Sequence, residues 1–145
     1  MARIKIDLPK RFSFSTIIPI RITDINYGNH AGNDAVLSII HEARMQYLRH
    51  FGYSEMEFAG TGMIMSDVAI EFKNELFYGE KVIASVAAGE FSKIGFELYY
   101  KLEKELDNKK LLVAASRTGI VCYDYKNKKI GALPEEAKMK LSGQH

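Results

Sequence analysis

One segment of the chain repeats its apolar residues with the period of an α-helix, while the runs around it resemble strands. Between residues 33 and 51 the apolar positions fall four, three, four and four residues apart, at Val36, Ile40, Ala43, Tyr47 and Phe51. This spacing places them on one face of a helix of about five turns. Asn33 or Asp34 is suited to cap its start, and Gly52 to end it. It is the only long helix that the sequence predicts.

Strand-like runs lie on both sides of this helix. Their β-branched content or alternation predicts strands at residues 12–23, 64–72, 81–91, 94–102 and 111–125. Pro19 has no N–H to donate, so we expect its strand to form a sheet edge or to bulge there. Pro134 is typical of the start of a short terminal helix.

One long helix against about five strands predicts an α+β domain, in which a sheet wraps on the helix. The 145 residues fit a single domain over residues 1–145. One helix leaves such a sheet with an open edge, and a second copy can continue the sheet there. We therefore expect a homodimer or homotetramer.

The composition excludes several classes of protein. The net charge of +2 comes from 20 basic and 18 acidic residues, which argues against a nucleic-acid partner. Cys122 is the only cysteine and lies in an apolar run, so we interpret it as a core residue. The four histidines lack the spacing of metal ligands, and no cofactor motif is present. No apolar run is long enough for a membrane span or a signal peptide, which favours the cytoplasm.

A glycine- and asparagine-rich stretch precedes the helix. Residues 24–33 read DINYGNHAGN, and residues 41–44 on the helix read HEAR. These pieces resemble the 4-hydroxybenzoyl-CoA thioesterase-like family, whose pattern is D-x-D-x-x-G-H-V-N-N followed by a helix with E-x-A-R. The matched positions are Asp24, His30, Asn33, Ala43 and Arg44. The resemblance implies a hotdog fold, an antiparallel sheet of about five strands around one long central helix.

Two later pieces extend the resemblance, and four positions depart from it. Residues 76–80 look like the family's P-L-x-x-G-D turn, and residues 133–136 look like its closing I-P-E-E. Asn26 stands where the family has its catalytic Asp, and His41 stands where it has the helix Glu, with Glu42 one residue later. Asn29 replaces a glycine, and Gly32 replaces the first Asn of the pair.

The resemblance implies hydrolysis of an acyl-CoA or acyl-carrier-protein thioester. An amide does not titrate near neutral pH, so Asn26 can position water but cannot take its proton. His30 has chemistry suited to that step. The expected catalytic residues are therefore Asn26, His30, Asp24 and Glu42. Donors at the helix start would hold the oxyanion, and the expected substrate-binding residues are Asn33, Asp34 and Asp67. Basic residues expected at the CoA phosphates are Lys73, Lys93 and Arg117.

Each of these residues also has an ordinary structural interpretation. His30 can fix the turn by bonding its backbone, Asp24 can brace the loop, and Asp34 can cap the helix. Asp67 lies on the non-core face of its strand. Glu42 and the basic residues can be plain surface charges, and Arg44 can be an ion-pair partner. Two other functions therefore stay open. One is a non-catalytic protein that binds an acyl thioester or a lipid-like ligand, and the other is an enoyl-thioester hydratase.

Overall fold

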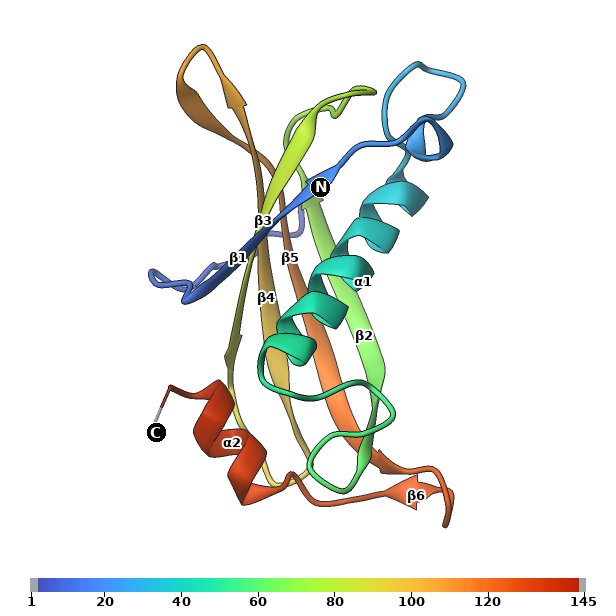
Figure 1. Cartoon of the computed structure of the whole chain (residues 1–145), viewed down its shortest axis with the longest axis vertical. Helices are drawn as coiled ribbons and strands as arrows, with labels where there is room; N and C mark the ends of the chain where they lie inside the picture. Colours follow the sequence, from blue (N-terminus) through green and yellow to red (C-terminus); the bar gives the residue numbers. More distant parts are fainter. Residues whose placement is uncertain (1–2, 144–145) are drawn as a thin grey trace.

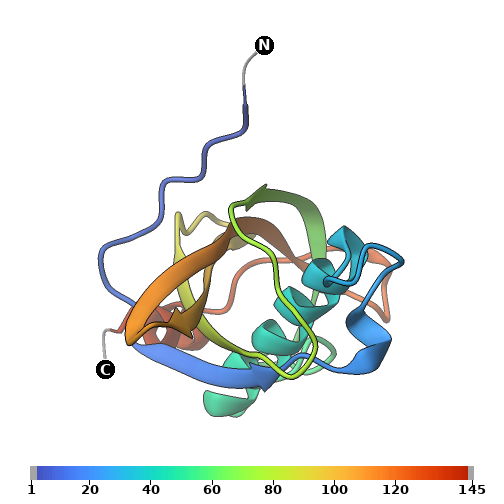
Figure 2. The ribbon, with the colours of Figure 1, turned by 90° about the horizontal axis from the view of Figure 1, so that it is seen from above.

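Helix α1 (Asn33–His50) lies against one face of an antiparallel sheet (Figure 1). The structure is a computed structural model and describes residues 3–143. The sheet order is β1-β3-β4-β5-β2, with a two-residue strand beside β5. The strands are β1 (Phe14–Pro19), β2 (Gly62–Phe72), β3 (Lys81–Gly89), β4 (Gly95–Leu106), β5 (Lys109–Asp124) and β6 (Lys129–Ile130). Seen from above, the strands curve around the helix (Figure 2).

The predicted α+β architecture is confirmed, including the long helix and the five main strands. The helix begins at Asn33 as predicted, although its N-cap is Gly32, which offers no side-chain cap. Strand β4 extends beyond the predicted residue 102 because β4 and β5 are joined by a two-residue turn at Asp107 and Asn108. Both turn residues have positive φ, of 53° and 64°, which suits a tight hairpin. The terminal helix predicted at Pro134 is α2 (Glu135–Leu141), for which Pro134 is the N-cap.

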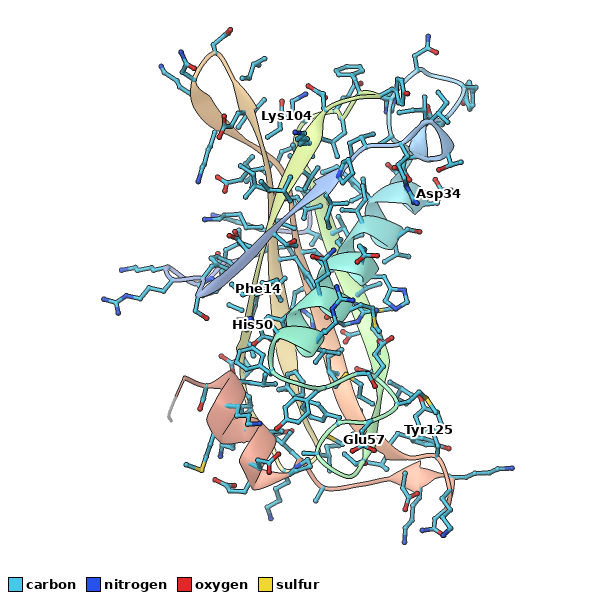
Figure 3. All side chains as sticks on the ribbon, in the orientation of Figure 1. Phe14, Asp34, His50, Glu57, Lys104 and Tyr125 are labelled. Atoms are coloured by element: carbon cyan, nitrogen blue, oxygen red, sulfur yellow. The ribbon has the colours of Figure 1, made fainter. Side chains whose placement is uncertain are left out.

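The core lies between α1 and the inner face of the sheet. The helix contributes its buried apolar stripe, and β3, β4 and β5 contribute alternate residues that are fully buried, among them Val82, Leu98, Tyr100, Val113 and Cys122. At the C-terminal end of α1, the rings of His50 and Phe14 are 5.3 Å apart, which ties the helix to β1 (Figure 3). This packing fixes the axis of α1 and therefore the place of its N-terminus.

A buried polar network also joins α1 to the sheet. Arg44 is 5% exposed and donates from Nε to Glu55 at 3.1 Å and from a terminal nitrogen to the Tyr100 hydroxyl at 3.2 Å. The Tyr100 hydroxyl also lies 2.8 Å from Thr118 Oγ1 on β5. The helix surface supplies a second contact to Glu55, from His41 Nε2 at 3.0 Å. Arg44 is thus an ion-pair partner inside the fold.

The two edges of the sheet differ. β1 is one edge, as predicted from Pro19, and this proline is its last residue. β2 is the other edge and is longer, with 11 residues. It leaves Met65, Val68 and Phe72 36–48% exposed. Among the described residues, no helix is long and apolar enough to cross a membrane.

Candidate functional site

The stretch before α1 folds into a tight turn that its own backbone holds. Asn26 N donates to His30 O at 2.9 Å, and Asn29 N donates to Asn26 O at 3.1 Å. Asn29 adopts a left-handed conformation with φ of 68°, which asparagine tolerates better than most residues. Gly32 N then donates to Asp24 O at 3.2 Å, and the helix begins. The turn therefore presents the Asn26 and His30 side chains beside the helix N-terminus.

The side-chain amide of Asn26 has a fixed orientation. Its Oδ1 accepts the N–H of Gly28 at 2.8 Å. Its Nδ2 group points toward the helix start, because a Cβ placed on Gly32 would lie 3.5 Å from that nitrogen. The same Cβ would collide with the Asp34 carboxylate, so Gly32 lets both groups approach the first turn of α1. Asn26 is thus placed as a hydrogen-bond donor at the helix N-terminus.

The tautomer of His30 follows from its partner. Nδ1 lies 3.1 Å from the Ala31 carbonyl oxygen, which can only accept, so Nδ1 carries the proton. In the neutral ring Nε2 then bears the free lone pair. His30 Nε2 and Asn26 Oδ1 both lie close to Gly28. A Cβ at that residue would be 3.2 Å from each of these two atoms. His30 therefore both fixes the turn and turns a potential proton acceptor toward Gly28.

A cavity of about 200 Å³ opens beside His30. Its walls come from the turn, from the first helical turn of α1 and from the segment between β2 and β3. The lining residues are His30, Ala31, Asn33, Val36, Phe72, Lys73, Asn74, Glu75, Leu76 and Val113. The first N–H groups of a helix have no partner within the helix. Of Asn33, Asp34 and Ala35, only Asn33 is among the residues that line this cavity, and Asn26 is not among them either. Positive dipole, free donors and His30 thus meet at one end of α1.

Asp24 and Glu42 line a different space. A groove of about 480 Å³ lies between β1 and α1, and both residues contribute to its wall. Asp24 is 8% exposed and accepts the Arg21 N–H at 2.8 Å, which braces the turn. Glu42 is exposed on the helix and accepts from Gln46 Nε2 at 2.8 Å. The structure therefore brings neither Glu42 nor Asp24 to the lining of the cavity of His30.

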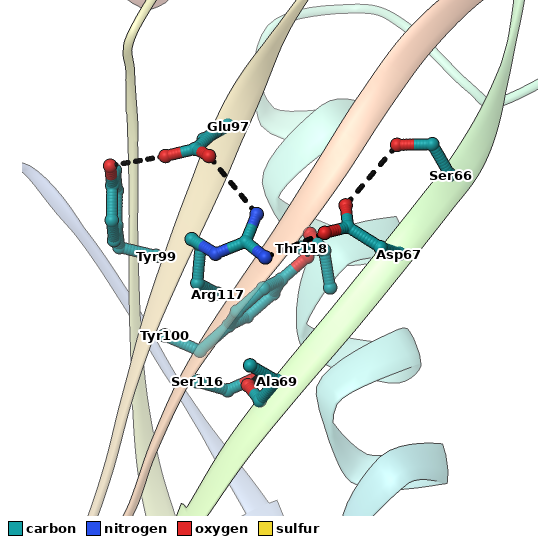
Figure 4. Close-up of polar contacts among 9 residues, drawn as sticks. All are labelled: Ser66, Asp67, Ala69, Glu97, Tyr99, Tyr100, Ser116, Arg117 and Thr118. Atoms are coloured by element: carbon teal, nitrogen blue, oxygen red, sulfur yellow. Dashed lines mark hydrogen bonds and ion pairs between the residues drawn. The ribbon is translucent and has the colours of Figure 1, made fainter. Parts of the chain in front are cut away.

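Asp67 and Arg117 face each other across neighbouring strands (Figure 4). Arg117 donates to Asp67 Oδ2 at 2.7 Å and to Glu97 Oε1 at 3.0 Å. The hydrogen bond from Arg117 holds the pKa of the Asp67 carboxyl below its ordinary value. These residues line a shallow hollow that His30 does not share. Lys93 lies in the β3–β4 turn, beside residues 132–138.

Lys73 is the one of the three predicted phosphate contacts that lines the cavity with His30. Its Nζ lies 2.7 Å from Glu71 Oε2, and this contact lowers the pKa of the Glu71 carboxyl. The lysine is exposed and follows directly after β2. A cation therefore stands at the rim of the cavity.

Glu75 is a residue of this cavity that the sequence analysis missed. Its Oε1 lies 3.9 Å from His30 Nε2. It occupies the first position of the turn that resembles P-L-x-x-G-D, where the family has proline. This departure from the family pattern is visible in the sequence, but it does not indicate that residue 75 lies beside His30. Among the described residues, no group of three or more His, Cys, Asp or Glu could hold a metal ion.

Comparisons with known proteins bear on this arrangement. No curated protein matches the chain. Among solved structures, a DHNA-CoA thioesterase from Staphylococcus aureus is 21% identical with a TM-score of 0.77, over 89% of this chain and 90% of its own. Slr0204, a 1,4-dihydroxy-2-naphthoyl-CoA thioesterase from Synechocystis, is 17% identical with a TM-score of 0.78, over 89% and 95%. SAV2348 from Staphylococcus aureus, solved in complex with CoA, is 15% identical with a TM-score of 0.80, over 97% and 87%.

These likenesses establish the fold, which is the hotdog fold that the resemblance predicted. The family profile described as "thioesterase-like superfamily" matches residues 20–141, which include the turn, all of α1 and the whole sheet after β1. The chain therefore belongs to the thioesterase-like superfamily.

Proposed function

We propose that this protein hydrolyses the thioester of an acyl-CoA or acyl-carrier-protein substrate in the cavity beside His30. The observation that carries the proposal is the orientation of His30. Its Nδ1 is engaged by the Ala31 carbonyl, and its Nε2 lies 3.9 Å from Glu75, which lines the same cavity as Asn33 at the start of α1. Membership in the thioesterase-like superfamily supports the reaction class. A similar structure solved in complex with CoA supports the substrate class.

The proposed chemistry uses three groups. Water attacks the thioester carbonyl carbon while His30 Nε2 takes its proton. The carbonyl oxygen becomes an oxyanion at the N-terminus of α1, where it receives a hydrogen bond from the N–H of Asn33, which lines the cavity. We propose that Asn26 Nδ2 and the Asp34 N–H, just outside the cavity lining, also donate to it. The C–S bond then breaks, and the leaving sulfur takes the proton back from His30. Each well-placed donor contributes about 3 kcal/mol to stabilising the transition state.

The roles of the remaining predicted residues follow from their neighbours. Asp24 supports the turn by holding Arg21 and Gly32, and Asp34 contributes its N–H and a negative charge at the helix start. Lys73 is proposed to contact CoA phosphates at the rim. Asp67, Arg117, Lys93 and Glu42 lie apart from this cavity within one chain, so we assign them no catalytic role.

We also propose that the active protein is a homodimer. The open edge of β2 and its exposed apolar residues support this assembly.

Thiol release tests the proposed reaction. Purified protein is mixed with acyl-CoA thioesters of short, long and aromatic acyl groups, and free thiol is followed with DTNB. We expect release from at least one of them, and release that falls by about 100-fold in H30Q. A folded protein that releases no thiol from any of these substrates would contradict the proposal.

A second candidate function is non-catalytic binding of an acyl thioester, and Asn26 in place of the family's Asp favours it. The variant N26D separates the two. If the protein is a binder, N26D gains hydrolysis over an inert parent. If the protein is the proposed hydrolase, N26D loses rate, since a carboxylate lacks the donor that Asn26 offers and repels the oxyanion. The parent's own rate of thiol release, measured beside N26D, decides between them.

A further inference from the structure

We infer that Glu75 is a positioning residue for His30 and supplies the carboxylate that the cavity lacks because residue 26 is asparagine. The inference rests on the proposed function, in which His30 takes a proton. It concerns a segment between β2 and β3 that lies far from the turn in sequence. Three observations carry it, namely the His30 tautomer, the short distance to Glu75, and the way in which the backbone around Glu75 is held.

The geometry puts the Glu75 carboxylate on the reactive side of the ring. Nδ1 of His30 is occupied by Ala31 O, so Nε2 is the nitrogen that faces the cavity. Glu75 Oε1 is 3.9 Å from Nε2, which is an ion-pair distance with room for a small adjustment. His30 has no closer acidic partner among the described residues. A negative charge at this distance stabilises the imidazolium that forms when Nε2 takes a proton.

The backbone carbonyls of Glu75 and of the next residue are both held by hydrogen bonds. Lys104 on β4 is only 6% exposed, and its Nζ donates to Glu75 O at 2.7 Å and to Glu80 Oε1 at 3.1 Å. The next residue, Leu76, is 1% exposed and accepts the Ala31 N–H at 2.8 Å. Burial of a lysine is costly unless its charge is compensated. A buried lysine that holds this segment in place therefore argues that the backbone position of Glu75 is fixed, while the Glu75 side chain itself is 60% exposed.

One of these two anchors, the hydrogen bond from Ala31 to Leu76, connects the segment directly to the turn. Ala31 follows His30 in sequence, and its N–H and carbonyl are used by Leu76 and by the His30 ring respectively. Ala31 thus bonds both to the His30 ring and to the residue that follows Glu75. Lys104 lies toward the same end of the molecule as Asp34 at the start of α1 (Figure 3).

A first test measures the effect of Glu75 on the His30 ring without measuring catalysis. Ring nitrogen resonances of His30 are recorded by NMR in the parent and in E75Q, and H30Q provides the assignment. We expect the His30 resonances to shift in E75Q, because the neighbouring charge is removed, while those of His41 and His50 stay in place. The matched control is E105Q, at an exposed carboxylate on β4, and it should leave all three unchanged. Unchanged His30 resonances in E75Q overturn the inference, whether or not the protein hydrolyses thioesters.

A second test measures the effect of Glu75 on the rate of thioester hydrolysis. E75Q should lower kcat by about tenfold with KM unchanged, as a partial loss of the roughly 100-fold effect expected of the base itself. E75D should recover part of the rate. If Glu75 acts through His30, the double variant H30Q/E75Q is no slower than H30Q alone. An active parent whose kcat is the same in E75Q overturns this inference and leaves the proposed hydrolysis standing, whereas an inactive parent contradicts the hydrolysis.

Discussion

Lys73 is the one residue, of the three expected to contact the CoA phosphates, whose position allows a test by a single substitution. It lines the cavity of His30, whereas Lys93 and Arg117 line other hollows. K73A should raise KM for an acyl-CoA by about twofold to fivefold and leave kcat unchanged, the scale of one exposed charge pair. The same acyl group on N-acetylcysteamine has no nucleotide phosphates, so its hydrolysis should be unaffected. Steady-state kinetics with both substrates check this.

The control for K73A is K109A, which removes an exposed lysine at the start of β5. It should change neither KM. Equal losses on the two thioesters in K73A would mean that Lys73 supports the cavity wall, through its contact with Glu71, and does not hold phosphate.

Part of the candidate site could be predicted from the sequence because its residues are neighbours along the chain. His30, Asn33 and Asn26 belong to one continuous stretch, so their spacing alone brings them to the helix start. Glu75 reaches the same cavity through the hydrogen bond between Ala31 and Leu76 and through the buried Lys104. Both are long-range contacts that no pattern within a segment encodes. For Glu42 and Asp67 the sequence did indicate exposure, but it could not say which hollow each would face.

At the scale of the elements, the Arg44 network predicts how α1 is held to the sheet. Replacing Arg44 by methionine leaves the Glu55 carboxylate with His41 as its only side-chain partner among the described residues. It also removes the hydrogen bond that Arg44 donates to the Tyr100 hydroxyl. The free energy of unfolding should fall by about 2 kcal/mol. This is below the roughly 3–5 kcal/mol for a fully buried pair, because the Glu55 side chain is 26% exposed. Urea denaturation measures the change, and R49M, at an exposed position on the same helix, should cost far less.

The same network predicts a dependence of stability on pH. Burial raises the pKa of the Glu55 carboxyl, but the bonds from His41 and Arg44 outweigh it and hold the pKa below the ordinary value of 4.5. The ionised Glu55 therefore stabilises the fold fully above pH 4.5. This contribution is lost as pH falls through the lowered value. The parent should be more stable than E55Q at neutral pH and should lose that advantage in acid, in urea titrations at a series of pH values. An advantage that grows in acid would contradict this assignment.

The helix and the strands could be predicted because the buried residues of each repeat with a single period. The apolar spacing of α1 and the β-branched runs of β1 to β5 follow from which face is buried, and both were read correctly. The strand ends were harder to predict. β4 runs on to Leu106 because Asp107 and Asn108 adopt positive φ, and β1 is shorter than expected because the chain leaves the sheet after Pro19. Ends depend on turn conformation and on partner strands, which alternation alone does not report.

At the scale of the whole molecule, the two open edges of the sheet are unequal. β1 has six residues and ends on a proline, which discourages further pairing. β2 has 11 residues and exposes Met65 and Val68. A second copy is therefore expected at β2, and charges placed there should block it. The variant M65K/V68K should show half the native mass of the parent by light scattering, whereas I17K on the β1 edge should not change it. Loss of mass in I17K alone would move the interface to β1.

The proposed dimer would affect catalysis through the size of the cavity. About 200 Å³ lies beside His30 in one chain, below the roughly 300–1,000 Å³ typical of small-molecule sites. Phe72, at the end of β2, lines this cavity and is 48% exposed, so a copy paired along β2 would cover the same space. The monomeric variant M65K/V68K should therefore keep its circular dichroism spectrum and lose at least tenfold in kcat/KM for a long-chain acyl-CoA, more than for acetyl-CoA. Equal rates in the monomer and the parent would mean that one chain encloses its substrate alone.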